Sequence, residues 1–275
     1  MTDLIPEPGP VQLHVDPVQG VVAARPDPQR RALGEWFMEP AGQRVARAEE
    51  RLVAAHLANL FGYNLLQVGT LPGLDLLASS RVLHRSVVDL GHASAVPPCD
   101  SVVRGSASAL PVESDRMDVV VLPHVVEFEA SPHEALREAA RVLIPEGHLV
   151  LTSFSPLSLF GVWRTVLRRR GNPPWNGHFV TAARMRDWLG LLGFELMDVA
   201  PLFFEPPVKI PRALHRLARL EPVVRKLCPV FAGCHVMLAR KRIATLTPIR
   251  PRFGYRRRLV GVSLAGPPAR VINRD

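Results

Sequence analysis

Two glycines near residue 70 could bring the main chain against a bound molecule. The run Asn64-Leu-Leu-Gln-Val-Gly69 predicts a strand, and the turn Thr70-Leu-Pro-Gly73 follows it directly. Glycine permits a tight turn, and because it has no Cβ the backbone can lie close to a ligand. Asp89 stands 20 positions after Gly69, at the end of a second apolar run. Its carboxylate could accept hydrogen bonds from two hydroxyl groups, and an ordinary turn aspartate is the alternative.

His124 and Glu127 form a second pair that could do chemistry. They come just after Asp118-Val-Val-Val-Leu122, an apolar run rich in β-branched residues that predicts a strand buried on both faces. A histidine at such a strand end could act as a base. A buried histidine with hydrogen-bond partners beneath the following helix is equally compatible with the sequence. Both interpretations stay open.

A helix and a further strand should hold this region in place. Ser131 is the predicted N-cap, with Pro132 at the first helical position and Glu134 closing a capping box. Apolar residues then recur at helical spacing, at Leu136, Ala139, Ala140 and Leu143. Residues 144–147 should end the helix, and residues 148–154 predict the next strand. Strand, helix and strand together predict one βαβ unit of a parallel sheet.

The same region resembles the class I S-adenosylmethionine-dependent methyltransferases of the type-11 kind. The resemblance is carried by Val103-Arg-Gly-Ser-Ala-Ser-Ala-Leu-Pro-Val112, Met117-Asp-Val-Val-Val121, His124-Val-Val-Glu127 and Ala135-Leu-Arg-Glu-Ala-Ala-Arg-Val-Leu-Ile-Pro-Glu-Gly-His-Leu-Val-Leu151. It implies a three-layer, Rossmann-like α/β fold with a seven-stranded, mostly parallel sheet whose last strand is antiparallel. It also implies transfer of the sulfonium methyl group of S-adenosylmethionine to an acceptor that the sequence does not identify.

The resemblance further implies which residues contact the cofactor. Gly69, Thr70 and Gly73 correspond to the glycine-rich motif of the family. Asp89 corresponds to the acidic residue that accepts hydrogen bonds from both ribose hydroxyls. The other implied cofactor contacts are Ser106, Ala107, Leu122 and Pro123.

Three residues depart from the family pattern at the implied cofactor site. Gln67 replaces an acid, Leu71 replaces the middle glycine of the motif, and Ser106 stands where an aspartate usually binds the adenine amino group. The leucine adds a side chain beside the expected place of the methionine part of the cofactor. The alternative function is therefore a catalytically inactive methyltransferase-like protein that binds a partner.

The acceptor side of the site is less well defined. His124, Glu127 and a loop with Trp175, Asn176 and His178 are the predicted acceptor-side residues. No catalytic residue is predicted, because the cofactor already activates the methyl group and the protein mainly supplies proximity and orientation. A Rossmann dehydrogenase is disfavoured, since Gly69-x-x-x-Gly73 is not the G-x-G-x-x-G fingerprint.

The chain is expected to contain one large domain with two tails. With 47% of its 275 residues hydrophobic, it can bury a sizeable core. Residues 1–33 hold six prolines and predict a disordered leader. Residues 34–243 form the predicted methyltransferase domain, whose first part, 34–60, reads as one amphipathic covering helix. Residues 244–275 show no periodicity and predict a disordered basic tail.

The net charge of +9 is concentrated at the C-terminal end. Residues 240–275 contain ten basic residues and one acid, which gives 10 − 1 = +9 and leaves residues 1–239 neutral. A basic segment with interleaved aromatic residues predicts weak, non-specific nucleic-acid contact through the 244–275 tail.

Cysteine usage and hydropathy argue against a disulfide-rich secreted protein, a metal protein and a membrane-spanning protein. Three cysteines at irregular spacing fit a reduced, cytoplasmic protein. A metal site built from Cys228, Cys234 and His235 lacks a fourth ligand at suitable spacing, so no metal is predicted. No run of about 18 apolar residues occurs, so no membrane-spanning helix is predicted.

Overall fold

The computed structural model describes residues 28–91, 96–158, 161, 177–202 and 232–242. The chain divides into two units, Met1–Ile243 and Ala244–Asp275, and all described residues belong to the first. The predictions for residues 1–27, for Trp175 and Asn176, for Cys228 and for the 244–275 tail lie outside the described residues. No helix in the described ranges is long and apolar enough to cross a membrane.

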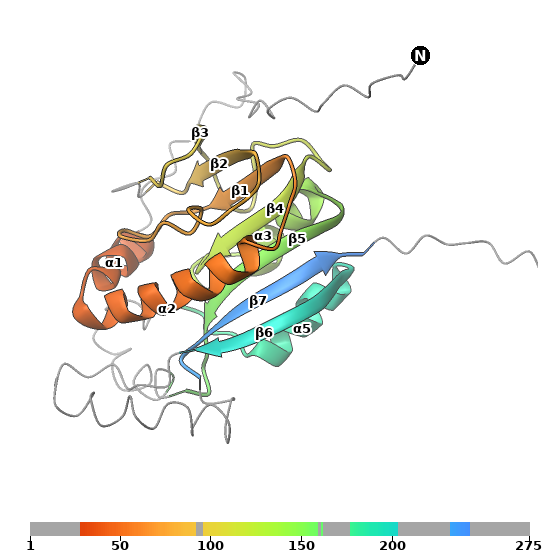
Figure 1. The fold of residues 1–275 in the computed structure, drawn as a ribbon. Helices are drawn as coiled ribbons and strands as arrows, with labels where there is room; N and C mark the ends of the chain where they lie inside the picture. Colours follow the sequence, from red (N-terminus) through yellow and green to blue (C-terminus); the bar gives the residue numbers. More distant parts are fainter. Residues whose placement is uncertain (1–27, 92–95, 159–160, 162–176, 203–231, 243–275) are drawn as a thin grey trace, which may run out of the picture. The chain divides into compact units, whose positions relative to one another are not determined.

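The described residues form a three-layer α/β fold around one mixed sheet (Figure 1). Its strands are β1 (Asn64–Val68), β2 (His84–Asp89), β3 (Ser101–Arg104), β4 (Met117–Pro123), β5 (Leu143–Phe154), β6 (Phe194–Leu202) and β7 (Cys234–Lys241). Their order is β3-β2-β1-β4-β5-β7-β6, and β7 alone runs antiparallel to both of its neighbours. This confirms the predicted seven-stranded, mostly parallel sheet with an antiparallel last strand.

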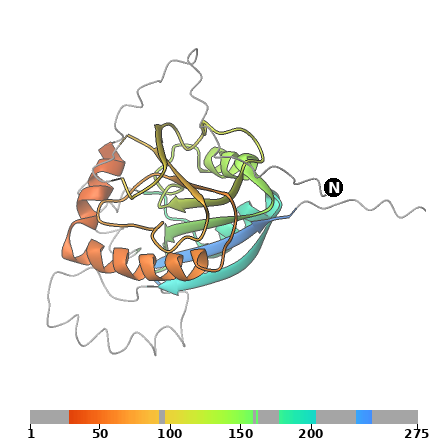
Figure 2. The ribbon, with the colours of Figure 1, turned by 45° about the horizontal axis from the view of Figure 1, so that its top comes forward.

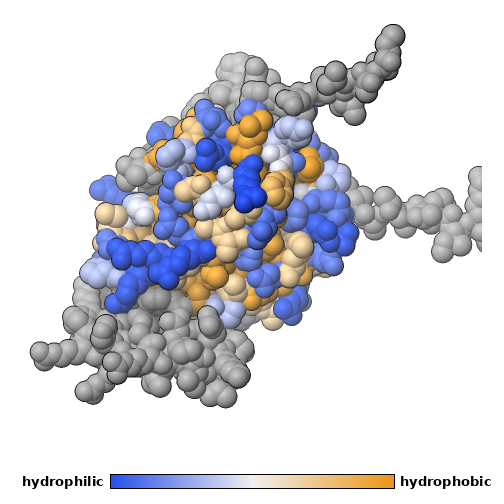
Figure 3. Space-filling view, viewed as in Figure 1, coloured by the Kyte–Doolittle hydropathy of each residue, from blue (hydrophilic) through white to orange (hydrophobic). Residues whose placement is uncertain are grey.

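The described helices cover both faces of the sheet. They are α1 (Pro28–Phe37), α2 (Pro40–Leu57), α3 (Pro132–Val142) and α5 (Ala182–Leu191). The helices α1 and α2 lie over one face, and α3 and α5 lie over the other (Figures 1 and 2). On the surface viewed in Figure 3, hydrophilic and apolar side chains are mixed rather than separated into two areas.

The central strands are buried because they carry apolar side chains to both layers. Every residue of β1 is buried, and Leu65 and Leu66 point to opposite core clusters. Leu65 pairs in register with Val119 of β4, and Leu66 pairs with Val120. Since successive side chains of a strand alternate between faces, a continuous apolar run fits a strand covered on both sides.

The crossover helix α3 begins as predicted but is not capped as predicted. It starts at Pro132, and Leu136 is fully buried. Ser131 makes no side-chain cap hydrogen bond, so the predicted capping box is wrong; its main-chain oxygen accepts from Glu134 N at 3.0 Å instead. The helix ends at Val142, and β5 begins at once because Leu143 pairs with Met117. Residues 144–147 are therefore the start of a strand rather than a loop.

The N-terminal helical region differs from the prediction in two ways. Residues 28–33, assigned to the disordered leader, form the first turns of α1 and bury Arg30 and Leu33. The predicted single helix over 34–60 is two helices, separated at Glu39, whose backbone is extended (φ −73°, ψ 156°). Pro40 explains the break, because proline disfavours a helical conformation in the residue before it.

Ion pairs hold the closing strand β7 to its surroundings. Lys241 Nζ lies 2.7 Å from Asp115 Oδ1, and Arg242 Nε lies 2.6 Å from Glu195 Oε2. Arg240 Nη2 lies 3.2 Å from the same Glu195 oxygen. Three of the ten basic residues between 240 and 275 therefore lie at the end of β7 or directly after it and are paired there. The basic residues after Ile243 number seven against one acid, so the tail itself carries 7 − 1 = +6.

Candidate functional site

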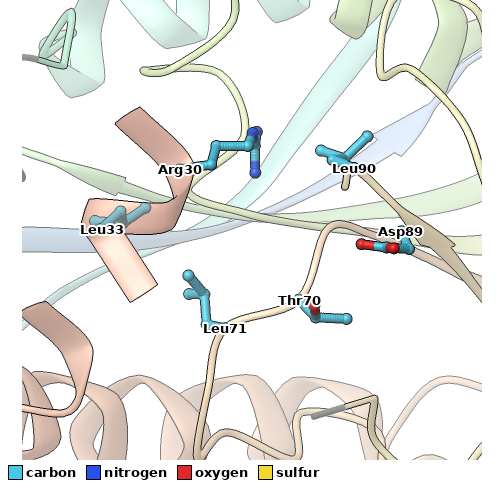
Figure 4. A pocket seen from close by; sticks show the side chains of 6 residues that line it. All are labelled: Arg30, Leu33, Thr70, Leu71, Asp89 and Leu90. Atoms are coloured by element: carbon cyan, nitrogen blue, oxygen red, sulfur yellow. The ribbon is translucent and has the colours of Figure 1, made fainter. Parts of the chain in front are cut away.

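A pocket lies where β1 and β2 end, at the carboxyl edge of the parallel strands. It is lined by Arg30, Leu33, Thr70, Leu71, Asp89 and Leu90 (Figure 4). Two of these residues come from α1, two from the loop after β1 and two from the end of β2. In open α/β sheets ligands bind at this edge, close to the point where the strand order reverses. The cavity is small, about 10 Å³, which is near the minimum that one water molecule needs.

The loop after β1 has the backbone geometry that its glycines predict. Gly69 has φ +81° and Gly73 has φ +75°, a left-handed conformation that side chains disfavour. A Cβ at Gly69 would lie 3.1 Å from Arg30 Nη1 and 3.2 Å from Leu90 Cδ1. Thr70, the next residue, lines the pocket. The left-handed conformation therefore favours glycine at position 69, and a Cβ there would also crowd the ends of the Arg30 and Leu90 side chains.

Asp89 places a nearly buried carboxylate beside this loop. Its exposed fraction is 4%, and its Oδ1 accepts a hydrogen bond from Gly91 N at 2.9 Å. Its Oδ2 lies 3.6 Å from Arg104 Nε, whose side chain is more than half exposed. Thus Asp89 lines the pocket from the β2 side, while Thr70 and Leu71 line it from the loop after β1.

Gln67 holds the loop after β1 through a hydrogen bond to its main chain. Its side chain is buried, and Nε2 donates a hydrogen bond to the main-chain oxygen of Gly69 at 2.9 Å. Its Oε1 is buried without a hydrogen-bond partner among the described residues. An acid at this position could not donate to Gly69, so the glutamine changes how the loop is held. Its role here is to fix the turn that carries Gly69.

Arg30 is a pocket residue that the sequence prediction missed. Its side chain is 6% exposed, and Nη2 donates to the main-chain oxygen of Val125 at 3.3 Å. The same nitrogen lies 3.5 Å from Glu129 Oε1. The residue was assigned to the leader, although Leu33, Trp36 and Phe37 after it follow helical spacing. That spacing is the signal that could have extended the helix back to Pro28.

Leu71 fills the space that the middle glycine of the motif would leave open. Its exposed fraction is 4%, and it belongs to the same core cluster as Leu33 and Trp36 of α1. Figure 4 shows Leu71 rising from the loop toward the side on which Leu33 lies. The departure from the glycine motif thus joins the loop to α1 through apolar packing.

His124 and Glu127 lie in a separate buried cluster. Both ring nitrogens of His124 are bonded: Nδ1 lies 3.0 Å from Glu127 Oε1, and Nε2 lies 2.8 Å from Glu49 Oε1. Glu127 Oε1 also accepts from Phe154 N at 2.7 Å. All three side chains are at most 1% exposed, and none lines the pocket. This is the geometry of a buried, hydrogen-bonded histidine, the second of the two interpretations above.

The electrostatics of this cluster fix the charge of the histidine. Burial lowers the pKa of His124, but the carboxylates of Glu49 and Glu127 outweigh it and raise the pKa to about 10. The imidazole is therefore protonated at neutral pH and cannot accept a proton. Its backbone is left-handed (φ +47°), and its ring stacks on Phe154 at 4.1 Å between centroids. The cluster joins α2, the β4 end and β5 by charge and packing.

The other predicted site residues lie at the same edge of the sheet but outside the pocket lining. Ser106 Oγ lies 2.9 Å from Ser108 Oγ and so bonds within its own turn. Ala107 and Leu122 are 1% exposed, and Pro123 pairs with Thr152 at the end of β4. His178 is exposed, and its main-chain N donates to Glu127 O at 2.7 Å. Across the described residues, no three His, Cys, Asp or Glu side chains gather as a metal site would require.

Comparison with known proteins agrees with the fold. The chain matches a family model described as a methyltransferase domain over residues 53–151. It is 30% identical over 212 residues to the uncharacterized protein YafS of Escherichia coli (strain K12), across 77% of this chain and 82% of that protein. It is 28% identical over 171 residues to the ubiquinone biosynthesis O-methyltransferase of Azorhizobium caulinodans, across 56% of this chain and 67% of that protein.

Among solved structures, an S-adenosylmethionine-dependent methyltransferase of Thermotoga maritima superposes with a TM-score of 0.55. The identity is 18%, and the match covers 76% of this chain and 93% of that one. At this identity the likeness shows the fold alone, and the sequence matches show the family. The chain belongs to the type-11 methyltransferase family.

Proposed function

We propose that the pocket binds S-adenosylmethionine and that the protein transfers its methyl group to an acceptor. One observation carries the proposal: the loop that begins at Gly69, with its left-handed φ of +81°, and the nearly buried Asp89 carboxylate follow adjacent parallel strands, and Thr70 of that loop lines one pocket together with Asp89. Backbone without a side chain suits close approach of a ligand, and a carboxylate suits a pair of hydroxyl donors. These are the two kinds of group that the ribose and methionine parts of the cofactor need.

The residues present fit the cofactor chemically. Asp89 would accept from the ribose hydroxyls, and the main chain from Gly69 to Gly73 would lie along the methionine part. Arg30, a nearly buried guanidinium in the pocket wall, would pair with the methionine carboxylate. The remaining predicted contacts, toward the adenine side, are Ser106, Ala107, Leu122 and Pro123.

The chain's own contribution to the reaction is binding, orientation and exclusion of water. The cofactor supplies an activated methyl group, so a well-aligned acceptor needs little further chemistry. His124 is excluded as a general base in this conformation, because both ring nitrogens are bonded and its pKa is raised to about 10. Trp175, Asn176 and His178 stay the predicted acceptor-side residues, whereas Glu127, like His124, is buried within the cluster.

A second function, partner binding without turnover, is favoured by the small pocket and by Leu71. Cofactor binding distinguishes the two functions, because only the methyltransferase requires it. With S-adenosylhomocysteine at about a hundred times its Kd, a competent site should gain roughly 2.7 kcal/mol of stability. We expect S-adenosylhomocysteine to raise the Tm by several degrees. In a separate assay with methyl-labelled S-adenosylmethionine, we expect the protein to transfer the label to a component of cell extract. No shift at millimolar ligand would favour the inactive alternative; a shift without transfer would leave binding intact and contradict turnover.

The basic tail provides a further proposal about partners. Its +6 charge and the aromatic residues Phe253 and Tyr255 beside Arg252 and residues 256–258 suit weak contact with single-stranded nucleic acid. Fluorescence anisotropy with a labelled oligonucleotide should show binding that weakens steeply with salt. Truncation after Ile243 should abolish that binding and leave S-adenosylhomocysteine binding unchanged. Salt-sensitive binding by the truncated protein would contradict a role of the tail.

A further inference from the structure

We propose that Glu138 and Arg141 of α3 are positioning residues for the adenine end of the cofactor, because they clamp the segment 105–112. This segment carries Ser106 and Ala107, which are predicted adenine-side contacts, so the proposal rests on the proposed function. Neither Glu138 nor Arg141 lines the pocket described above. Their effect on a ligand would therefore pass through the main chain of the segment.

The segment leaves the sheet beside the carboxylate that is proposed to bind the ribose. Arg104, the last residue of β3, pairs in register with Asp89 of β2, and Gly105 N donates to Asp89 O at 3.0 Å. Ser106 and Ala109 then form an antiparallel bridge, in which Ala109 N donates to Ser106 O at 3.3 Å. The chain thus folds into a tight turn directly after the strand end that neighbours Asp89.

The far end of this turn is held by α3. Leu110 N donates to Glu138 Oε2 at 2.9 Å, and Leu110 O accepts from Arg141 Nη2 at 3.1 Å. Arg141 Nη1 also donates to Val112 O at 2.8 Å. The two side chains bind each other as well, since Nη2 and Nε of Arg141 donate to the two oxygens of Glu138 at 2.7 and 2.8 Å. A guanidinium suits this clamp because it offers five donors in a rigid, planar fork.

The clamp combines charge with partial burial. The side chains of Glu138 and Arg141 are 20% and 35% exposed. Hydrogen bonds from Arg141, and to a lesser extent from Leu110 N, lower the pKa of Glu138 against the opposing effect of burial. The acceptor is therefore an ionised carboxylate, which makes stronger hydrogen bonds than a neutral one. Ala107, Leu110 and Val112 also pack in the same core cluster as the apolar face of α3.

A clamped segment should affect one part of the cofactor more than the others. A loop that is already fixed in its bound position avoids the cost of being ordered when the ligand binds. In contrast, Asp89 and Thr70 are positioned by the ends of β2 and β1, which pair with each other in the sheet. We therefore expect the clamp to matter for ligands that contain adenine and to be dispensable for ligands that lack it.

Arg141→Ala tests this difference between ligands. It should weaken S-adenosylhomocysteine binding about tenfold, because the loosened segment must be ordered on binding. It should leave the binding of S-ribosylhomocysteine unchanged, since that molecule has the ribose and amino-acid parts but no adenine. Glu138→Gln keeps the shape of the side chain without its charge and should weaken S-adenosylhomocysteine binding by a smaller factor. Titration calorimetry, by displacement for the weaker ligand, measures the affinities. Equal weakening for the two ligands would overturn the positioning role.

Arg116→Ala is the matched control. The side chain of Arg116 is more than half exposed, and its Nη2 lies 2.8 Å from Glu113 Oε2, within the same part of the chain rather than across to α3. This variant loses an arginine and an ion pair but keeps the clamp, so it should bind both ligands as wild type does. Weakening of S-adenosylhomocysteine binding as large as in Arg141→Ala would assign the effect to lost positive charge.

Hydrogen exchange reports on the clamp without any ligand. In Arg141→Ala the amides of Ala109 and Leu110 should exchange faster than in wild type, while the β1 amides stay protected; unchanged exchange would contradict the clamp. If wild type binds no S-adenosylhomocysteine at millimolar concentration, the proposed function fails and the adenine role fails with it. If wild type binds and Arg141→Ala binds both ligands equally well, the proposed function stands and the positioning role is overturned.

Discussion

The pocket and the His124 cluster lie at the same carboxyl edge of the sheet, but they are built in opposite ways. The pocket is lined by Arg30 from α1 and by Asp89 from the end of β2, together with three leucines and a threonine (Figure 4). The cluster brings Glu49, His124 and Glu127 into direct contact and buries them to 1% exposure or less. Polar groups that line a pocket can also face a ligand, whereas polar groups that only contact one another inside the core mainly serve the fold.

This difference also separates the roles of two motifs in the sequence. The glycine-rich loop departs from its family pattern at Gln67 and Leu71, and each departure replaces openness to a ligand with an internal contact. The H-x-x-E motif is kept, and its histidine uses both nitrogens internally. Here the kept motif supports the fold, and the modified motif lies where we propose that the cofactor binds.

The comparison predicts its largest effect for Glu49→Ala. Removing one partner from a buried ion pair leaves an incompletely compensated charge and typically costs about 3–5 kcal/mol. Urea denaturation should show a loss of this size. Glu50→Ala, one position along α2 and only half-buried, should change the free energy of unfolding by less than about 1 kcal/mol. Equal losses in the two variants would show that the cluster is not a special support of the fold.

The same cluster predicts how stability depends on pH. The pKa of His124 is raised to about 10 in the folded protein, against an ordinary 6.5, by Glu49 and Glu127. A raised pKa means that its stabilisation is complete below about pH 6.5 and is lost as pH rises toward 10. The nearby Cys234 thiol, whose pKa is held well above its usual range by burial and the same carboxylates, stays neutral throughout that window.

We therefore expect the free energy of unfolding to fall by a few kcal/mol between about pH 6.5 and 10. Urea titrations at several pH values measure the slope. In His124→Gln this part of the slope should vanish, because glutamine does not titrate. A variant that keeps the wild-type slope would assign the pH dependence to other groups.

The sequence was a better guide to the architecture than to the site. All seven strands were predicted within a few residues where they are apolar and β-branched, because burial on both faces dictates that composition. Two side-chain contacts complete these elements in the structure. Thr181 Oγ1 accepts from Arg184 N at 3.2 Å at the start of α5, and Asp118 Oδ2 accepts from Tyr63 N and Asn64 N at 3.0 and 2.8 Å at the start of β1.

The pocket wall and the His124 partners were missed because they join distant parts of the chain. Arg30 reaches Val125 across 95 positions, and Glu49 reaches His124 across 75. Periodicity within one segment carries no information about such pairs. The start of α1 is different: the helical spacing of Leu33, Trp36 and Phe37 was available in the sequence, but the prolines before it favoured a disordered leader.

Asp89, at the end of β2, and Asp118, near the start of β4, allow ligand affinity and fold stability to be tested separately. Asp89→Ala should weaken S-adenosylhomocysteine binding by roughly 1.5–3 kcal/mol, because a charged acceptor for the ribose hydroxyls is lost. Asp118→Ala should leave affinity unchanged and lower stability by about 1–3 kcal/mol, since the main-chain donors of Tyr63 and Asn64 lose their partner. Calorimetry and urea denaturation on both variants measure these effects, and the reverse order would invalidate the assignment.

The smallest expected effect concerns Arg30, and it depends on which ligand is offered. Arg30→Ala should weaken S-adenosylhomocysteine binding about tenfold, because the charge-assisted bond to the carboxylate is lost. It should leave binding of 5′-methylthioadenosine unchanged, since that molecule has the ribose and adenine but no amino-acid part. Arg31→Ala is the matched control. Arg31 is exposed, and in the described part of the chain it pairs with Glu35, one turn along α1. Equal weakening for the two ligands would show that Arg30 holds α1 in place rather than reading the carboxylate, so the pocket would distinguish its ligands through Asp89 alone.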